Sequence, residues 1–362
     1  NYRVRVNLSK IGKQFMNLKT KFLIFLALIA IPIATPICTS CADYKLRIEN
    51  NGQQSVKSIN NEFIKTLPNA QKQNIIKTES LTLRTESGIE FPTIFINNNS
   101  SHILVLGQGF PGGKESMKSF IDYLGSDFDY IIFDYRWTQI FKFMCKPSTL
   151  IHPFQKLLCE EQEELFAIAK YIRLKERERN RTYKERIALG ECYSNFVFVK
   201  SQVLSQQQGN AIFTKLILDS CWLSLKDFVD SICFDPYLPC SPQEGGTPLW
   251  IKRILTLKWI HAPISKIARL LTPQISISPY LAQLENIPVL FIHGTNDLMV
   301  PRKHFDKIWE DTATHQKAAF ITPHAHSDNF KKESRHLYKY LVKTFAYSNF
   351  DEFYQNVEEN SD

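Results

Sequence analysis

The segment IALGECYSNF, residues 187–196, places a cysteine where an apolar run gives way to a helical pattern. The run ends at Gly190, and Cys192 and Ser194 follow at intervals of two residues. A strand that turns sharply into a helix exposes the residue at its apex, and the second neighbours of that residue must be small. There a thiol also lies at a helix N-terminus, whose dipole stabilises a thiolate. Cys192 is therefore a candidate nucleophile, although a free cysteine is often just a small buried side chain.

Candidate acids and bases follow later apolar runs. Asp297 lies in IPVLFIHGTNDLMVP, whereas His324 and His326 both lie in AFITPHAHSD. Asp219 ends an earlier run, KLILDS, and is an alternative acid. The chain order nucleophile, acid, histidine is one of the known orders of a catalytic triad.

A glycine-rich loop and a histidine pair offer further chemistry. The loop GQGFPGG, residues 107–113, directly follows an apolar run and can present backbone N–H groups to a developing oxyanion. His324 and His326 have the alternate spacing that would let both bind one metal ion, but no further ligands accompany them. We therefore expect neither a metal nor another cofactor.

These candidate residues lie far apart in the sequence, so they can act together only if the fold brings their segments to the same end of a sheet. Six short apolar runs are continuous rather than alternating, as in strands buried on both faces: 102–107, 129–134, 186–190, 215–220, 287–294 and 317–323. Residues 80–97 alternate around Gly88 and predict a hairpin, and residues 160–180 have helical spacing. The alternation of strands and helices predicts an α/β fold with a mostly parallel central sheet and helices on both faces.

The alternation breaks between residues 221 and 284, which contain Pro236, Pro239, Pro242 and many aromatic and basic residues. About sixty residues without a clear strand, placed between two core strands, predict a helical cap insertion. Its apolar side chains could touch a bilayer, but packing onto the core is the stronger expectation.

The positive charge is concentrated at the N-terminus. The formal net charge is +8, and six Lys and Arg residues precede the apolar run Phe22–Ala34, which leaves about +2 for the rest of the chain. This excludes a charge-driven nucleic-acid binder. A basic segment, a short apolar run and a small-residue exit predict a secretory signal or an uncleaved membrane anchor, and hence an exported or membrane-associated protein.

Two cysteine features follow from that location. Cys41 is a candidate lipidation site, although Cys38 stands where such signals prefer leucine. In an exported chain, Cys233 and Cys240 are the pair that we most expect to form a disulfide.

Five motifs in order resemble those of the α/β-hydrolase superfamily, of the serine-hydrolase and acyl-esterase type. They are Gln108-Gly109-Phe110-Pro111, Asp134-Tyr135-Arg136-Trp137, Gly190-Glu191-Cys192-Tyr193-Ser194, His293-Gly294-Thr295-Asn296-Asp297-Leu298-Met299-Val300-Pro301 and Ala325-His326-Ser327-Asp328. The resemblance covers residues 79–345 apart from the insertion. It implies an α/β-hydrolase fold with a helical cap.

The resemblance also assigns roles. It implies that Cys192 is the nucleophile, His326 the base and Asp297 the acid, with His324 and Asp219 as alternatives. The N–H groups of Phe110 and Tyr193 would hold the oxyanion. The chain departs from the family at three places: cysteine replaces the nucleophilic serine, Ser194 the second elbow glycine and Gln108 the loop histidine. Cysteine nucleophiles occur in dienelactone-hydrolase-like branches of the superfamily.

Together these patterns predict an exported or membrane-attached acyl hydrolase, esterase- or thioesterase-like, that acts on a small acyl substrate through a thioester. The alternative is a catalytically inactive scaffold that binds a ligand or a protein partner in the cell envelope. The expected parts of the chain are a signal or anchor at 1–41, a polar spacer at 42–78, the first part of the core at 79–220, the cap at 221–284, the second part of the core at 285–347 and an acidic tail at 348–362.

Overall fold

The computed structural model describes residues 44–50, 53–59, 77–109, 112–139, 160–227, 274–297, 299–330 and 335–359. All of them belong to one compact unit, formed by Thr39–Ser231 and Pro273–Asp362. The second unit, Asn1–Cys38 with Ile232–Thr272, lies outside the described residues, and so do the predicted signal or anchor, Cys41, the Cys233–Cys240 pair and most of the predicted cap.

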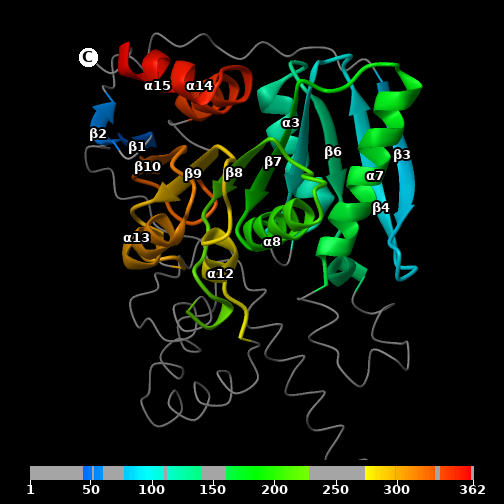
Figure 1. The fold of residues 1–362 in the computed structure, drawn as a ribbon, viewed down its shortest axis with the longest axis horizontal. Coiled ribbons are helices and arrows are strands. Elements are labelled where there is room, and N and C mark those ends of the chain that lie inside the picture. The colour runs from blue at the N-terminus through cyan, green and yellow to red at the C-terminus, as the bar shows by residue number, and fades with distance from the viewer. Residues whose placement is uncertain are drawn as a thin grey trace, which may run out of the picture. The chain divides into compact units, whose positions relative to one another are not determined.

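A ten-stranded sheet forms the centre of the described unit (Figure 1). Its strands are β1 (Tyr44–Asn50), β2 (Gln53–Ile59), β3 (Lys77–Arg84), β4 (Glu90–Asn97), β5 (His102–Gly107), β6 (Asp129–Phe133), β7 (Glu185–Glu191), β8 (Lys215–Asp219), β9 (Val289–Gly294) and β10 (Lys317–Thr322). Their order across the sheet is β2-β1-β10-β9-β8-β7-β5-β6-β4-β3.

Six neighbouring strands run parallel: β10, β9, β8, β7, β5 and β6. On one side β1 and β2 continue the sheet with antiparallel pairing, and on the other side β4 and β3 do so. The mostly parallel sheet predicted from the apolar runs is therefore confirmed. The six runs become β5 to β10 because their side chains are buried on both faces, as in β5, where all six residues are buried.

Helices cover both faces of the sheet (Figure 1). They are α3 (Lys118–Leu124), α7 (Gln162–Glu178), α8 (Tyr193–Gln207), α12 (Ser278–Leu281), α13 (Arg302–Asp311), α14 (Arg335–Tyr347) and α15 (Phe350–Glu359), with short 3-10 turns η1 (Lys114–Met117) and η2 (Arg136–Gln139). In one layer α8 contacts α7 and α12, and α12 contacts α13. In the other layer α14 contacts α3 and α15.

Alternate residues along the strands point to opposite faces of the sheet and pack against the two layers of helices. Leu104 and Leu106 of β5 belong to the core cluster beneath α3, α14 and α15, so Ile103 and Val105 face the other layer. In α7 the helical spacing that predicted a buried face is confirmed, because Leu165, Ile168 and Ile172 are buried. The core thus holds the parallel strands rigidly, with their carboxyl ends at one edge.

Two sequence predictions at the ends of the core are wrong. Residues 44–50 and 53–59 of the predicted polar spacer form β1 and β2, and Leu46 and Ile48 of β1 are buried in the core cluster. Within the predicted acidic tail, α15 buries Phe350, Phe353 and Val357. Spacings of three and four residues place these three on one face of a helix, and the charged residues between them hid that pattern.

The described flanks of the predicted cap are joined to each other. Leu225 N–H donates to the carbonyl of Ile275 (2.9 Å) and Ile277 N–H to that of Leu223 (3.0 Å). Next to this bridge, Leu281 and Leu284 are fully buried. The chain therefore leaves and rejoins the core at one fixed place.

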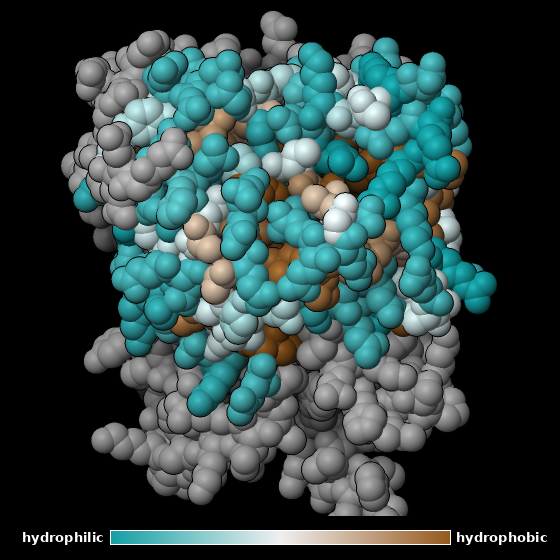
Figure 2. Space-filling model, in the orientation of Figure 1, coloured by the Kyte–Doolittle hydropathy of each residue, from teal (hydrophilic) through white to brown (hydrophobic). Residues whose placement is uncertain are grey.

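The described surface is mainly polar. Figure 2 shows hydrophilic side chains over most of one face, and Leu174 and Tyr347 are the exposed large hydrophobic residues among those described. None of the helices in the described ranges is both long and apolar enough to cross a bilayer.

Candidate active site

Cys192 lies at the sharp turn between β7 and α8. Its backbone has φ 54° and ψ −111°, a left-handed conformation that strains a residue with a side chain. Its N–H donates to the carbonyl of Asp219 at the end of β8 (3.0 Å), which fixes the turn against the neighbouring strand. The cysteine is the N-cap residue of α8, where the helix dipole favours a negative charge. The sharp turn lies where the spacing placed the candidate nucleophile.

The small residues around the turn are required by close contacts. A Cβ on Gly190 would lie 2.6 Å from the Asn195 side-chain oxygen and 2.8 Å from Phe198. Ser194 stands where the family has a second glycine, and it fits because Gly107 opposite has no side chain: a Cβ there would lie 2.7 Å from Ser194. Ser194 Oγ instead donates to the carbonyl of Gln108 (2.5 Å). This departure is thus accommodated structurally.

His326 and Asp297 form a hydrogen-bonded pair beside the elbow. His326 Nδ1 lies 2.8 Å from Asp297 Oδ2, and the carboxylate is fully buried whereas the imidazole is 12% exposed. The other carboxylate oxygen, Oδ1, accepts the backbone N–H groups of Met299 (2.9 Å) and Val300 (2.8 Å). Because both oxygens are engaged, the carboxylate cannot rotate and holds the ring in one orientation.

The electrostatic surroundings of His326 favour the imidazolium. Burial lowers its pKa, but the negative charges of Asp297 and Cys192, together with the hydrogen bond to Asp297, outweigh burial and raise the pKa well above its usual value. Since Nδ1 faces Asp297, Nε2 is the nitrogen available to the thiol. A cation stabilised between a carboxylate and a sulfur is what a thiolate nucleophile requires.

The alternative acid and base are placed differently. Asp219 is fully buried and binds Asn329, Ser220 and Tyr338 rather than a histidine. His324 does not share the Asp297 carboxylate, whose partners are His326 and two backbone amides. Among the described residues no three or more His, Cys, Asp or Glu side chains are gathered as for a metal ion.

One of the two predicted oxyanion donors lies at the site. Tyr193 is the first residue of α8, and first-turn amides point out of the N-terminal end of a helix. Phe110 lies outside the described residues, but the loop before it passes close to the nucleophile, since a Cβ on Gly109 would lie 3.1 Å from that of Cys192. A backbone oxyanion site between the loop and the helix is sterically reasonable.

Several residues next to the site carried no recognisable sequence signal. Tyr193 OH donates to Glu161 (3.2 Å), a buried acid just before α7. Burial and the neighbouring Glu164 raise the pKa of Glu161 well above its usual value. Asn329, which binds Asp219, has no motif that would identify it. These contacts depend on tertiary packing, and no spacing rule could have found them.

Comparison with known proteins gives matches in structure alone. No family model and no curated protein sequence matches the chain. The Pyrococcus furiosus esterase Pf2001 matches with a TM-score of 0.54 at 14% identity, over 76% of this chain and 95% of the esterase. A Pyrobaculum calidifontis esterase matches with a TM-score of 0.51 at 14% identity, over 78% of this chain and 86% of its own.

A Rhizomucor miehei esterase matches with a TM-score of 0.50 at 12% identity, over 79% of this chain and 86% of its own. Likenesses at these identities concern the path of the chain rather than its chemistry. The strand order and the sharp turn between β7 and α8 are features of this chain itself. The chain has the α/β-hydrolase fold.

Proposed function

We propose that the protein is an acyl hydrolase, esterase- or thioesterase-like, that uses Cys192, His326 and Asp297. The observation that carries the proposal is the pairing of His326 with Asp297 at 2.8 Å next to a thiol on a strained elbow. Strained backbone persists where the surrounding structure enforces it, and it is concentrated at functional sites. The esterases with the same fold support the choice of acyl transfer over other chemistries.

The reaction begins with the Cys192 thiolate beside the His326 imidazolium. The sulfur attacks the acyl carbon, and the carbonyl oxygen becomes an oxyanion held by the N–H groups of Tyr193 and Phe110. The carbon–oxygen bond to the leaving group then breaks, and His326 Nε2 protonates the departing alkoxide. This leaves a thioester on Cys192 and a neutral imidazole.

Water completes the cycle. His326 takes a proton from the water as its oxygen attacks the thioester, and collapse of the second oxyanion releases the carboxylic acid and the thiolate. Asp297 stays ionised throughout and stabilises each imidazolium. Esters and thioesters fit this scheme better than amides, because expulsion of an amine demands more acid assistance.

The test compares turnover and covalent labelling in matched variants. Wild-type protein should hydrolyse short p-nitrophenyl esters or acyl thioesters, and an acyl probe should label Cys192, as located by mass spectrometry. Cys192→Ala should abolish both signals. His326→Ala should remove turnover and slow labelling. Cys221→Ala is the control, because Cys221 is the other described free thiol and is also buried.

The competing hypothesis, an inactive scaffold, makes the opposite prediction. Turnover would be undetectable, and iodoacetamide would label Cys192 no faster than Cys221. That result, in folded protein, would overturn the proposed hydrolase activity. The paired imidazole and carboxylate support the enzyme, because a scaffold has no need to hold a histidine beside a thiol.

The proposal extends to location. The basic and apolar segment within residues 1–41 supports export or membrane attachment. Fractionation of cells expressing the full chain, compared with a variant that lacks residues 1–41, is the test. Recovery of both proteins in the same soluble intracellular fraction would overturn this part of the proposal.

A further inference from the structure

Asp219 lies at the junction between the elbow and the histidine loop. It is the last residue of β8 and is fully buried. Its main-chain carbonyl accepts two hydrogen bonds from the elbow, from Cys192 N–H (3.0 Å) and from Asn195 Nδ2 (2.6 Å). The backbone of Asp219 therefore fixes the turn that carries the nucleophile.

The side chain of Asp219 is bonded to the histidine loop. Asn329 Nδ2 donates to its Oδ1 (2.6 Å), and Thr322 Oγ1 donates to the amide oxygen of Asn329. Ser220 Oγ also donates to Asp219 Oδ1 (3.0 Å) and accepts the N–H of Ser327 (3.0 Å), the residue after His326. Two short chains of hydrogen bonds thus join the Asp219 carboxyl to the loop between β10 and α14.

Three strained residues meet at this network. Cys192, Ser220 and Ser327 have φ angles of 54°, 53° and 55°, in the left-handed region that favours glycine. None of them is Gly or Asn, the residues that adopt this conformation readily. Each costs conformational free energy, so each must be held by its surroundings. Each of the three residues is also hydrogen-bonded to Asp219, directly or through Ser220.

We propose that Asp219 is a positioning residue that keeps the loop bearing His326 in register with the elbow bearing Cys192. The inference rests on the proposed function and deepens it. Asp219 does not touch the imidazole, so its role differs from that of Asp297. It fixes the distance between base and nucleophile, on which proton transfer depends.

The charge around Asp219 is consistent with a structural hydrogen-bonding role. The groups that face its carboxyl are Glu191 on the elbow, Ser220, Asn329 and Tyr338 of α14, whose OH donates to Oδ2 (3.2 Å). Burial, with the nearby Glu191 charge, raises the pKa of Asp219 to about 7, and the three donors lower it only in part. Within the described ranges no cation is among the groups around this carboxyl, so it is suited to receiving neutral donors.

The experiment breaks the network at Asn329, which is not one of the proposed catalytic residues. Asn329→Ala removes the bridge between Asp219 and Thr322. Asn98→Ala is the matched control, because Asn98 is also a buried asparagine, and its Nδ2 donates to the Phe128 carbonyl (2.8 Å) beside the opposite ends of the strands. The two readouts are kcat and KM on an ester or thioester, and the rate of Cys192 alkylation by iodoacetamide at about pH 6.5.

Asn329→Ala should lower kcat about 10- to 100-fold with KM changed less than about threefold, because misplacement of the base affects the chemical step. Alkylation of Cys192 should slow about tenfold, because the imidazolium no longer lies beside the sulfur. Asn98→Ala should leave both quantities unchanged even where it lowers the melting temperature. The exchange variant Asp219→Asn with Asn329→Asp keeps one amide and one carboxylate in contact, and should recover part of kcat.

The alkylation readout does not need turnover, so it separates the two proposals. Failure of the proposed function would appear as absence of hydrolysis by the wild type, with the alkylation difference between variants retained. The positioning role would be overturned if Asn329→Ala kept wild-type kcat and alkylation, or if Asn98→Ala lost them equally.

Discussion

The two ends of the parallel strands differ in how their loops turn. In the described part of the chain, six residues other than glycine have positive φ: Asn99, Asn180, Asn286, Cys192, Ser220 and Ser327. The three asparagines lie in loops that lead into strands, at the amino ends. Asparagine adopts the left-handed conformation at little cost. The cysteine and the two serines follow strands, at the carboxyl ends, where the candidate active site lies. Backbone strain is therefore concentrated at the carboxyl ends of the strands.

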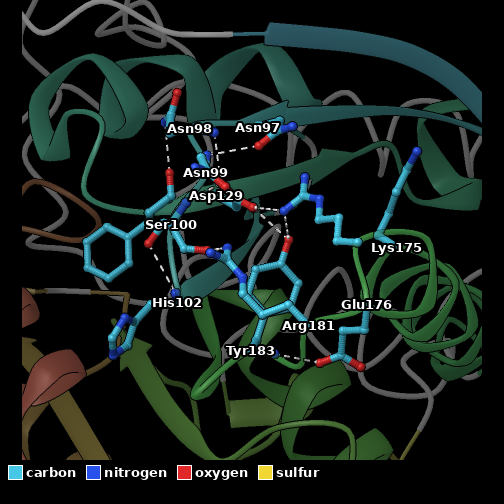
Figure 3. A network of polar contacts seen from close by, with 12 residues as sticks. Asn97, Asn98, Asn99, Ser100, His102, Asp129, Lys175, Glu176, Arg181 and Tyr183 are labelled. Carbon is cyan, nitrogen blue, oxygen red and sulfur yellow. Dashed lines mark hydrogen bonds and ion pairs between the residues drawn. The ribbon is translucent and has the colours of Figure 1, made fainter.

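Buried charges at the amino ends have well-matched partners. Asp129 at the start of β6 accepts the N–H groups of Asn98 and Ser100, the Tyr183 OH and an Arg179 guanidinium N–H, and Figure 3 shows this network. Lys215 Nζ donates to three carbonyls at the end of α14. At the carboxyl ends, by contrast, both amide atoms of the buried Gln108 lack a hydrogen-bond partner among the residues that the structure describes. We therefore expect the amino ends to contribute mainly to stability, whereas the carboxyl ends hold the candidate catalytic residues.

The largest expected effect is at the carboxyl ends. Asp297→Asn should lower kcat by about 10³–10⁴-fold, because the amide can no longer stabilise the imidazolium or fix its tautomer. The melting temperature should change little, because Asn still accepts the Met299 and Val300 amides. Steady-state kinetics with differential scanning calorimetry checks both. A large fall in melting temperature alongside the loss of kcat would contradict the contrast between the two ends of the strands.

At the amino ends the expectation is reversed. Asp129→Ala deprives the partly exposed Arg179 and the buried Tyr183 of their shared acceptor, and should lower the free energy of unfolding by about 3–5 kcal/mol. The folded fraction should keep the wild-type kcat, because no group at the site touches Asp129. Urea denaturation with kinetics at a temperature where the variant is folded tests this. A kcat loss greater than about tenfold would contradict it.

The sequence predicted the central strands of the sheet well, but it did not predict β1 and β2 at one side. Short continuous apolar runs that alternate with helical patterns indicate strands buried on both faces. Strands β1 and β2 have one covered face or an open edge, so they need few apolar residues. In β1 only Leu46 and Ile48 provide the signal, and the polar residues around them outweighed it.

At the site, the sequence identified residues that motifs constrain. Cys192, Asp297 and His326 are each fixed by local geometry, a turn or a strand end, and local geometry leaves a pattern in sequence. It did not indicate the hydrogen bond of Asp219 with Asn329 or that of Ser220 with Ser327, because these join segments about a hundred residues apart. Both Asp219 and Asp297 follow strands, and the preference for Asp297 as the acid came only from the resemblance to the family. Only the tertiary structure shows which carboxylate faces an imidazole.

The pH dependence of stability should report on Asp219. Above about pH 4 the unfolded chain releases the proton of this carboxyl, whereas the native protein keeps it until its pKa of about 7. Stability is therefore lost as the pH rises through this window. Between about pH 5 and 8 the loss should be roughly 2–3 kcal/mol.

Asp219→Asn does not titrate and should remove this part of the slope. The comparison is the free energy of unfolding of wild type and variant at both pH values, with Asp134→Asn as a control for a partly exposed aspartate. Parallel slopes for wild type and Asp219→Asn would show that the carboxyl is ionised throughout the range.

The smallest expected effect concerns Ser194 at the elbow. It tests whether this serine indicates that catalytic activity has been lost. Ser194→Gly restores the family residue and removes one buried hydrogen bond, so it should cost about 1 kcal/mol and change kcat less than about threefold.

Gly107→Ala in the wild type places a methyl group 2.7 Å from Ser194 and from Phe198, and overpacking of this kind costs about 1–3 kcal/mol. In the Ser194→Gly background one of these two clashes is gone, so Gly107→Ala should cost less there. A double-mutant cycle by urea denaturation measures that coupling. Additive effects would mean that Gly107 and Ser194 do not compensate each other, and a large gain of activity in Ser194→Gly would show that the serine impairs the nucleophile.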